Sequence, residues 1–313
     1  MDCHSLVFRL VMNTAYPRKF KTTYMTSTLL KLAAYCFFIL ANLKGFANEP
    51  VNSENAFNIP RSEVFDLEDP TTKRIYPIFV KVPRSYINSG QRKYPVIYVI
   101  DALYAFQVIS GATRFPMNTN VIEEAIIVGI SYAKADIGVT SRVRDYTPFE
   151  DAGWRVETGQ AEQHHHFIKN TVISKIEKRF RAKSSDRTLV GNSLGGLFSA
   201  YILMKHPETF DNYIIGSPSV WFKDNQILAQ LINPLSLEDK KAYISVGKLE
   251  TPEYGEQEDM VSGAKALYQK LRNQMPDSNI KLALIPEANH GTAFPTTSIQ
   301  GLYWLNKVAG KND

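Results

Sequence analysis

Residues 188–201 read Thr-Leu-Val-Gly-Asn-Ser-Leu-Gly-Gly-Leu-Phe-Ser-Ala-Tyr, and this stretch is the strongest local signal in the chain. An apolar strand runs into G-x-S-x-G, and a helix-forming segment follows at once. Such a strained strand-to-helix turn exposes its serine at the end of a sheet, and Gly191 and Gly195 let the neighbouring backbones approach closely. We therefore predict Ser193 as a nucleophile rather than as a structural serine in a glycine-rich turn. The helix beginning near Leu194 would turn free N–H groups towards an oxyanion, which makes Leu194 a candidate donor.

The rest of the chain supplies the sheet that such a turn needs. The middle and late strand-like runs are short and apolar throughout, which is typical of strands buried on both faces of a parallel sheet. Helical patterns lie between them, as in 260–271, where apolar residues recur every three or four positions. The predicted strands are Glu63–Leu67, Ile75–Val82, Val96–Ile100, Ala125–Ile130, Thr188–Val190, Tyr213–Ile215, Lys241–Val246 and Lys281–Ile285.

This order of elements predicts an α/β fold, a three-layer sandwich around a mostly parallel sheet, in the layout of the α/β-hydrolase fold. We expect one domain over residues 48–313, since no repeat or long linker interrupts it. A doubly wound nucleotide-binding fold is the structural competitor, but no Gly-rich phosphate loop follows the first strands.

The partners of the serine follow it along the chain in this fold, first an acid and then a histidine. His206 lies at the far end of the helix that starts beside the serine, roughly 20 Å along its axis, so it cannot be the base. His290, in the loop after the last predicted strand, is the histidine that the topology permits. For the acid, Glu250 is best placed after the strand 241–246, Glu253 is the reserve, and a Ser–His dyad without a carboxylate is a third arrangement.

The first 47 residues have the pattern of an export signal. Residues 28–43 are apolar apart from Lys31, and Gly45 and Ala47 fit the −3 and −1 positions of a signal peptidase site. Met25 stands just upstream of this pattern and is a candidate for the true start. We expect a cleaved signal peptide and a periplasmic or secreted enzyme, with an uncleaved membrane anchor as the alternative.

The net positive charge of the chain comes from the first 47 residues, the predicted leader. The net charge is +5, and the leader alone carries six basic residues and one acid, so residues 48–313 hold 30 basic and 30 acidic residues. The sequence therefore gives no support for a nucleic-acid partner. Both cysteines, Cys3 and Cys36, lie in the leader as well, which leaves the mature chain without a disulfide or thiol chemistry.

Two further features of the sequence could belong to a binding site: a run of histidines and a tryptophan. Three consecutive histidines, 164–166, point in different directions on a helix and lack acidic partners at ligand spacing, so we expect no metal and no cofactor. Gly216–Phe222 follows a predicted strand at the edge where the serine lies, and Trp221 would form an aromatic wall of the substrate pocket. A tryptophan packed in a surface turn is the alternative.

Several segments together resemble the family of esterases related to esterase D and to the periplasmic siderophore esterases. They occur in family order and span about residues 63–305: Tyr94–Leu103, Arg142–Pro148, Gly191–Gly196, Ser217–Trp221 and Asn289–Gly291. The resemblance implies a second oxyanion donor in the loop after strand 96–100. The family usually has Asp-Gly-Asp or Asp-Gly-Asn there, whereas this chain has Asp-Ala-Leu, so Ala102 and Leu103 both stay candidates. It also implies that Arg142 and Arg144 lie at the pocket rim or brace the turn 145–148, with bracing preferred; Arg142 is our candidate for substrate binding.

We therefore expect a serine carboxylic ester hydrolase that works through an acyl-enzyme on a small-molecule ester. Siderophore-type lactones are the most specific substrate that the resemblance suggests, and they rest on analogy. Small-ester or acyl-thioester hydrolysis and acyl transfer to another alcohol use the same residues. A non-catalytic binding protein on the same fold is disfavoured by the presence of both Ser193 and His290.

Overall fold

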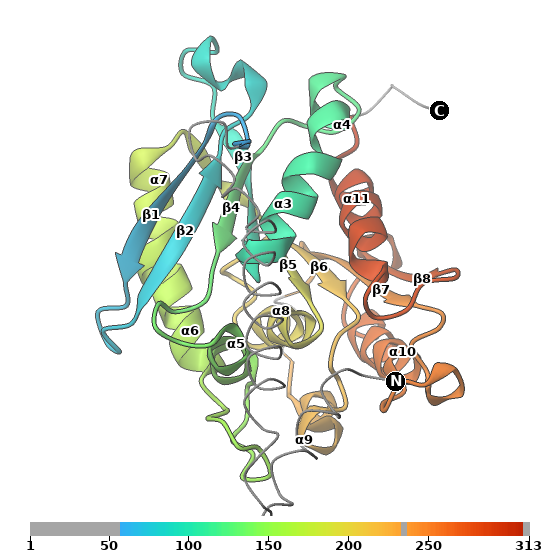
Figure 1. Cartoon of the computed structure of the whole chain (residues 1–313). Helices are drawn as coiled ribbons and strands as arrows, with labels where there is room; N and C mark the ends of the chain where they lie inside the picture. The colour runs from blue at the N-terminus through green and yellow to red at the C-terminus, as the bar shows by residue number, and fades with distance from the viewer. Residues whose placement is uncertain (1–56, 233–236, 309–313) are drawn as a thin grey trace, which may run out of the picture. The chain divides into compact units, whose positions relative to one another are not determined.

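A single mixed sheet organises the protein. The computed structural model describes residues 57–232 and 237–308, and in this part the strands lie in the order β1-β2-β4-β3-β5-β6-β7-β8 (Figure 1). The pairs β1/β2 and β2/β4 are antiparallel, and every pair from β4/β3 to β7/β8 is parallel. The strands are β1 (Ser62–Glu68), β2 (Ile75–Lys81), β3 (Tyr94–Ile100), β4 (Ile126–Ile130), β5 (Ala182–Asn192), β6 (Asn212–Gly216), β7 (Lys241–Gly247) and β8 (Ile280–Ile285).

Helices cover both faces of the sheet, as the alternation of side chains along β3 shows. Tyr98 and Ile100 belong to a core that includes α8 and α10, while Ile97 and Val99 belong to a second core with α3 and α11 (Figure 1). The helices are α3 (Ala102–Ala112), α4 (Arg114–Asn118), α5 (Gly138–Tyr146), α6 (Ala161–Phe167), α7 (Ser174–Arg179), α8 (Leu194–Lys205), α9 (Phe222–Asn225), α10 (Met260–Arg272) and α11 (Ala293–Asn306). This is the three-layer α/β-hydrolase arrangement, so the predicted fold class is confirmed.

All eight predicted strands are present, and most ends differ by one or two residues. The exception is β5, which begins at Ala182 and not at Thr188. Its first half is polar and partly exposed, with only the second half buried, so hydrophobicity alone identified just the buried end. The predicted apolar face of α10 is confirmed, since Ala264, Leu267 and Leu271 are fully buried.

The unit Asn58–Asp313 is compact by itself. Within the residues that the structure describes, we find no helix with the length and apolar character needed to cross a membrane. The predicted signal peptide, residues 1–47, lies outside the described residues.

Candidate active site

Ser193 occupies a sharp turn between β5 and α8. Its backbone has φ 61° and ψ −121°, a conformation that L-residues rarely adopt and that is often found at functional sites. The amide of Ser193 donates to the carbonyl oxygen of Gly216 on the next strand at 2.9 Å, which anchors the turn. A Cβ at position 191 would lie 2.1 Å from the carbonyl oxygen of Gly195. Only glycine fits at position 191, as the spacing of the motif predicts.

Glu250 and His290 meet at the same edge of the sheet. Glu250 follows β7 and is fully buried, and His290 lies in the loop between β8 and α11. Nδ1 of His290 and Oε2 of Glu250 are 2.6 Å apart. The other carboxylate oxygen accepts hydrogen bonds from the Ser217 hydroxyl at 2.6 Å and from the Gly247 amide at 2.7 Å. These three partners hold the Glu250 carboxylate in place, and the carboxylate orients the His290 imidazole.

The loop that carries His290 is shaped by its own neighbour. The Asn289 side-chain oxygen accepts hydrogen bonds from the Gly291 amide at 3.1 Å and the Thr292 hydroxyl at 3.0 Å. The hydrogen bond to Glu250 raises the pKa of His290 against the opposing effect of burial, and the charges of Glu250 and Glu256 raise the pKa further. The environment thus favours a protonated imidazole more than water does.

Two cavities lie around Ser193 and His290, and both residues line both of them. The first is about 190 Å³ and is also lined by Asp101, Tyr132 and Arg142. The second is about 280 Å³; its further lining includes Ser219, Trp221, Glu256 and Met260. Ser219 was missed from the sequence, although it follows β6 at the same edge; its Oγ lies 3.4 Å from that of Ser193.

Arg142 lies in the first cavity and does not brace the turn 145–148, so the preferred expectation for it is wrong. Its Nε and Nη2 each donate to one oxygen of Asp101 at 3.1 Å, and Nη2 is 3.4 Å from the carbonyl oxygen of Asn192. The Tyr132 hydroxyl also donates to Asp101, at 2.8 Å. Asp101 directly follows β3, and this position at the carboxyl end of a parallel strand was the signal that could have identified it.

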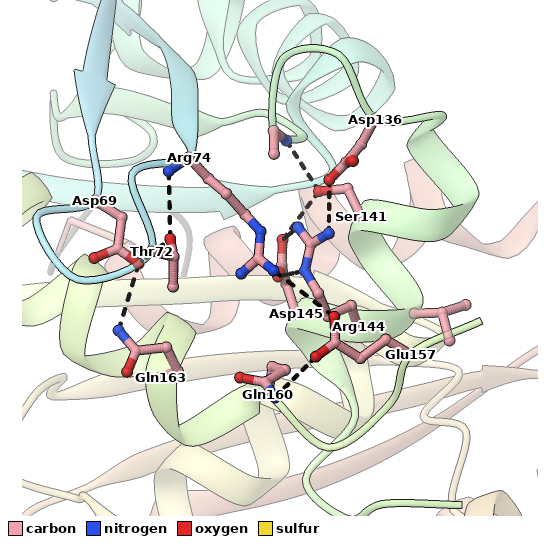
Figure 2. Close-up of polar contacts among 12 residues, drawn as sticks. Asp69, Thr72, Arg74, Asp136, Ser141, Arg144, Asp145, Glu157, Gln160 and Gln163 are labelled. Atoms are coloured by element: carbon pink, nitrogen blue, oxygen red, sulfur yellow. Dashed lines mark hydrogen bonds and ion pairs between the residues drawn. The ribbon is translucent and has the colours of Figure 1, made fainter. Parts of the chain in front are cut away.

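The bracing role belongs to Arg144. Its guanidinium donates to both oxygens of Asp145, at 2.8 and 3.1 Å, and to Asp136 at 2.6 Å (Figure 2). Asp145 also accepts from the Ser141 hydroxyl at 2.9 Å and the Tyr76 hydroxyl at 3.1 Å. Arg144 and Asp145 are both buried, so this network ties α5 to β2 behind the cavity and not within it. The two arginines are two residues apart, and a helix directs such positions to different sides.

The oxyanion candidates stand at two helix N-termini. Leu194 is the first residue of α8, while Ala102 and Leu103 open α3, where the first backbone N–H groups have no partner within the helix. The side chain of Ala102 is buried and that of Leu103 is exposed. Both helices start at the carboxyl ends of neighbouring strands, β5 and β3, so their N–H groups converge on one edge of the sheet.

Trp221 lies in a turn and lines the same cavity as Ser193, so it is both a packed turn residue and a wall of the cavity. It lines the second cavity and stacks on Trp154, with ring centroids 6.3 Å apart and 12° between the planes. Trp154 comes from the segment between α5 and α6, which carried no signal for a site. Both rings are partly exposed, and Trp221 is the one that lines the second cavity.

The sheet order and the strained serine turn define the protein as an α/β-hydrolase, and comparison with known proteins narrows the class. Residues 70–281 match the family described as "Putative esterase". The ferri-bacillibactin esterase BesA of Bacillus subtilis is 33% identical over 238 residues, which cover 70% of this chain and 80% of that protein. The siderophore triacetylfusarinine C esterase of Aspergillus fumigatus is 33% identical over 176 residues, 54% of this chain and 60% of that one.

The solved structures agree with these relatives. The crystal structure of the BES protein from Bacillus cereus superposes with a TM-score of 0.70 at 28% identity, covering 83% of this chain and all of that one. The chain belongs to this esterase family, and it is a carboxylic ester hydrolase. The family resemblance predicted from the sequence is confirmed.

Proposed function

We propose that the protein hydrolyses siderophore-type lactone esters through an acyl-enzyme on Ser193. The observation that carries the proposal is the 2.6 Å contact between His290 and the buried Glu250 at the edge where Ser193 lies, in a chain whose relatives are siderophore esterases. Because Nδ1 of His290 faces Glu250, Nε2 remains to take the proton of the Ser193 hydroxyl. The serine oxygen then attacks the ester carbonyl.

The imidazolium next gives its proton to the alcohol that leaves, and the same base activates a water that releases the acid. Amides of Leu194 and of the first turn of α3, Ala102 or Leu103, would stabilise the oxyanion of each tetrahedral intermediate. Arg142 and Trp221 line the two cavities and would contact the two sides of the substrate. The fixed Arg142–Asp101 pair offers a neutral polar wall, and Trp221 offers an aromatic one.

The substrate is tested by giving the untagged enzyme a catecholate trilactone, a hydroxamate-type ester siderophore and short p-nitrophenyl esters, and following the products by mass spectrometry. We expect ring opening of a siderophore ester at a kcat/KM well above that for the short esters, and no turnover in Ser193→Ala. Turnover of the short esters alone would reject the siderophore part and leave a general carboxylesterase. If an added alcohol collects the acyl group in preference to water, the enzyme is an acyltransferase.

We also infer that the enzyme acts outside the cytoplasm, on the sequence pattern of residues 1–47. Mass spectrometry of the exported protein would then find a chain that begins at Asn48. A cell-associated chain that keeps its leader would support the membrane anchor instead.

The pH dependence gives a direct test of the base. Since His290 must be neutral to act, kcat/KM falls as the pH drops through its pKa, and the negative charge of Glu256 raises that pKa. Removing the charge in Glu256→Gln should therefore move the acid limb of the pH–rate profile to lower pH. We expect kcat on the alkaline plateau to stay within about twofold, because a partly exposed charge contributes little else.

Glu253→Gln is the matched control, since Glu253 is an exposed carboxylate on the same loop. It should leave the acid limb where it is. If the acid limb shifts equally in both variants, then the overall charge of the protein, and not the local field at His290, determines the pH at which the limb lies.

A further inference from the structure

A second cluster of polar side chains lies on α6, outside the two cavities. Glu162, His165 and His166 each place a possible ligand atom within 4.8 Å of the others. The expectation that this histidine run lacks an acidic neighbour is wrong. Glu162 stands one helical turn before His166, and residues four apart share a helix face.

The carboxylate of Glu162 is held in place by residues at the end of α8. Its Oε2 accepts a hydrogen bond from the Tyr201 hydroxyl at 2.6 Å, and it lies 2.9 Å from Nε2 of His206 and 3.3 Å from Nζ of Lys205. The other oxygen, Oε1, lies 3.1 Å from Nε2 of His166. Carboxylates that bind metal ions are commonly held by such outer hydrogen-bond partners.

His165 supplies a nitrogen donor that lacks a full set of partners. The residue is 2% exposed and stacks on His206 with ring centroids 4.0 Å apart. Its Nε2 lies 2.9 Å from the Thr209 hydroxyl, and its buried Nδ1 has no hydrogen-bond partner in the described structure. Buried polar atoms are normally paired, so this nitrogen marks an unfilled position.

We propose that Glu162, His165 and His166 bind a divalent ion of the zinc type, with water completing its coordination. Two imidazoles and one carboxylate form a donor set that suits Zn²⁺. The 3.1 Å between Glu162 and His166 is close to the roughly 3.3 Å that separates two ligands of tetrahedral zinc bound at about 2.0–2.1 Å. The His166 side chain is 56% exposed, so it can change rotamer and the ion has a path from solvent.

All three ligands lie on α6, so this one helix would hold the ion, and its binding is independent of the ester chemistry proposed above. One nearby charge weakens the binding of a metal ion. The Lys205 ammonium lies 3.3 Å from the Glu162 carboxylate and repels a cation. Removing that charge should strengthen binding, which is a prediction that a merely structural hydrogen-bond network does not make.

The test is calorimetric titration of the untagged full chain with Zn²⁺, together with the visible absorption of Co²⁺ as a spectroscopic substitute. We expect one ion per chain, affinity lowered at least about tenfold in His166→Gln and in Glu162→Gln, and tighter binding in Lys205→Met. His290→Ala is the control for metal adventitiously held at the active site and should bind as the parent does. Absence of binding at millimolar Zn²⁺, or equal affinities in the parent, His166→Gln and Glu162→Gln, overturns the proposal.

Discussion

Ser193→Ala should lower kcat towards p-nitrophenyl esters by about 10⁶-fold, leaving only the small acceleration that the oxyanion donors and substrate binding supply. The reason is that the hydroxyl forms the acyl-enzyme, and no other group at the turn can replace it. Ser193 makes no side-chain cap hydrogen bond to α8, and alanine carries a Cβ as serine does, so the strain at φ 61° is much the same in the variant. Circular dichroism and thermal unfolding should match the parent, and steady-state kinetics measures the loss.

Ser219→Ala is the matched control, because its hydroxyl lies 3.4 Å from that of Ser193 at the same cavity. We expect it to keep kcat within about tenfold, since its oxygen has no assigned part in bond making. The double variant Ser193→Ala/His290→Ala should be no slower than Ser193→Ala, because residues that act as one unit are not additive. A large further loss in the double variant would mean that the two residues do not work together.

Glu250→Gln should lower kcat by about 10³–10⁴-fold. The carboxylate accepts hydrogen bonds from three donors: the His290 ring, the Ser217 hydroxyl and the Gly247 amide. A glutamine amide has one accepting oxygen and an NH₂ group that must donate. If its NH₂ faces His290, then Nδ1 becomes the acceptor, the proton moves to Nε2, and the ring can no longer take a proton from Ser193. Kinetics with short esters measures the effect, and thermal unfolding reports whether the buried substitution leaves the fold intact.

Glu253→Gln tests whether Glu253, rather than Glu250, is the acid that orients His290. Glu253 is exposed on the loop that follows Glu250, and we expect its substitution to change kcat by no more than about twofold. If Glu253→Gln is the impaired variant, Glu253 is the acid. If neither change matters, the enzyme works as a Ser–His dyad.

The fold could be predicted because its signals are local. Buried parallel strands are short and apolar, and the serine turn needs glycine at fixed positions, so both are visible without any knowledge of tertiary contacts. The first half of β5 was missed because residues 183–187 are polar and partly or fully exposed, and the register with β3 is irregular between Ala182 and Arg187. Hydrophobic patterns carry no signal for such a segment.

Some residues of the candidate site could also be predicted from the sequence, and others could not. Topology alone put Glu250 and His290 at one edge of the sheet, since both follow parallel strands. Partner choice could not be predicted in that way: Arg142 and Arg144 look interchangeable in the sequence, yet one meets Asp101 and the other meets Asp145. The difference depends on which side of α5 faces the cavity. Glu162, by contrast, could have been found from its spacing of four residues to His166.

The position of Ser193 between two cavities bears on the shape of molecule that the enzyme can cleave. A nucleophile at the bottom of a blind pocket must receive a chain end, because only an end can enter. Here the scissile bond can lie across the serine while the molecule continues on either side. If the substrate is the lactone proposed above, its closed ring would need no free terminus to be opened, and the linear product of the first cut would be able to bind again at an internal bond.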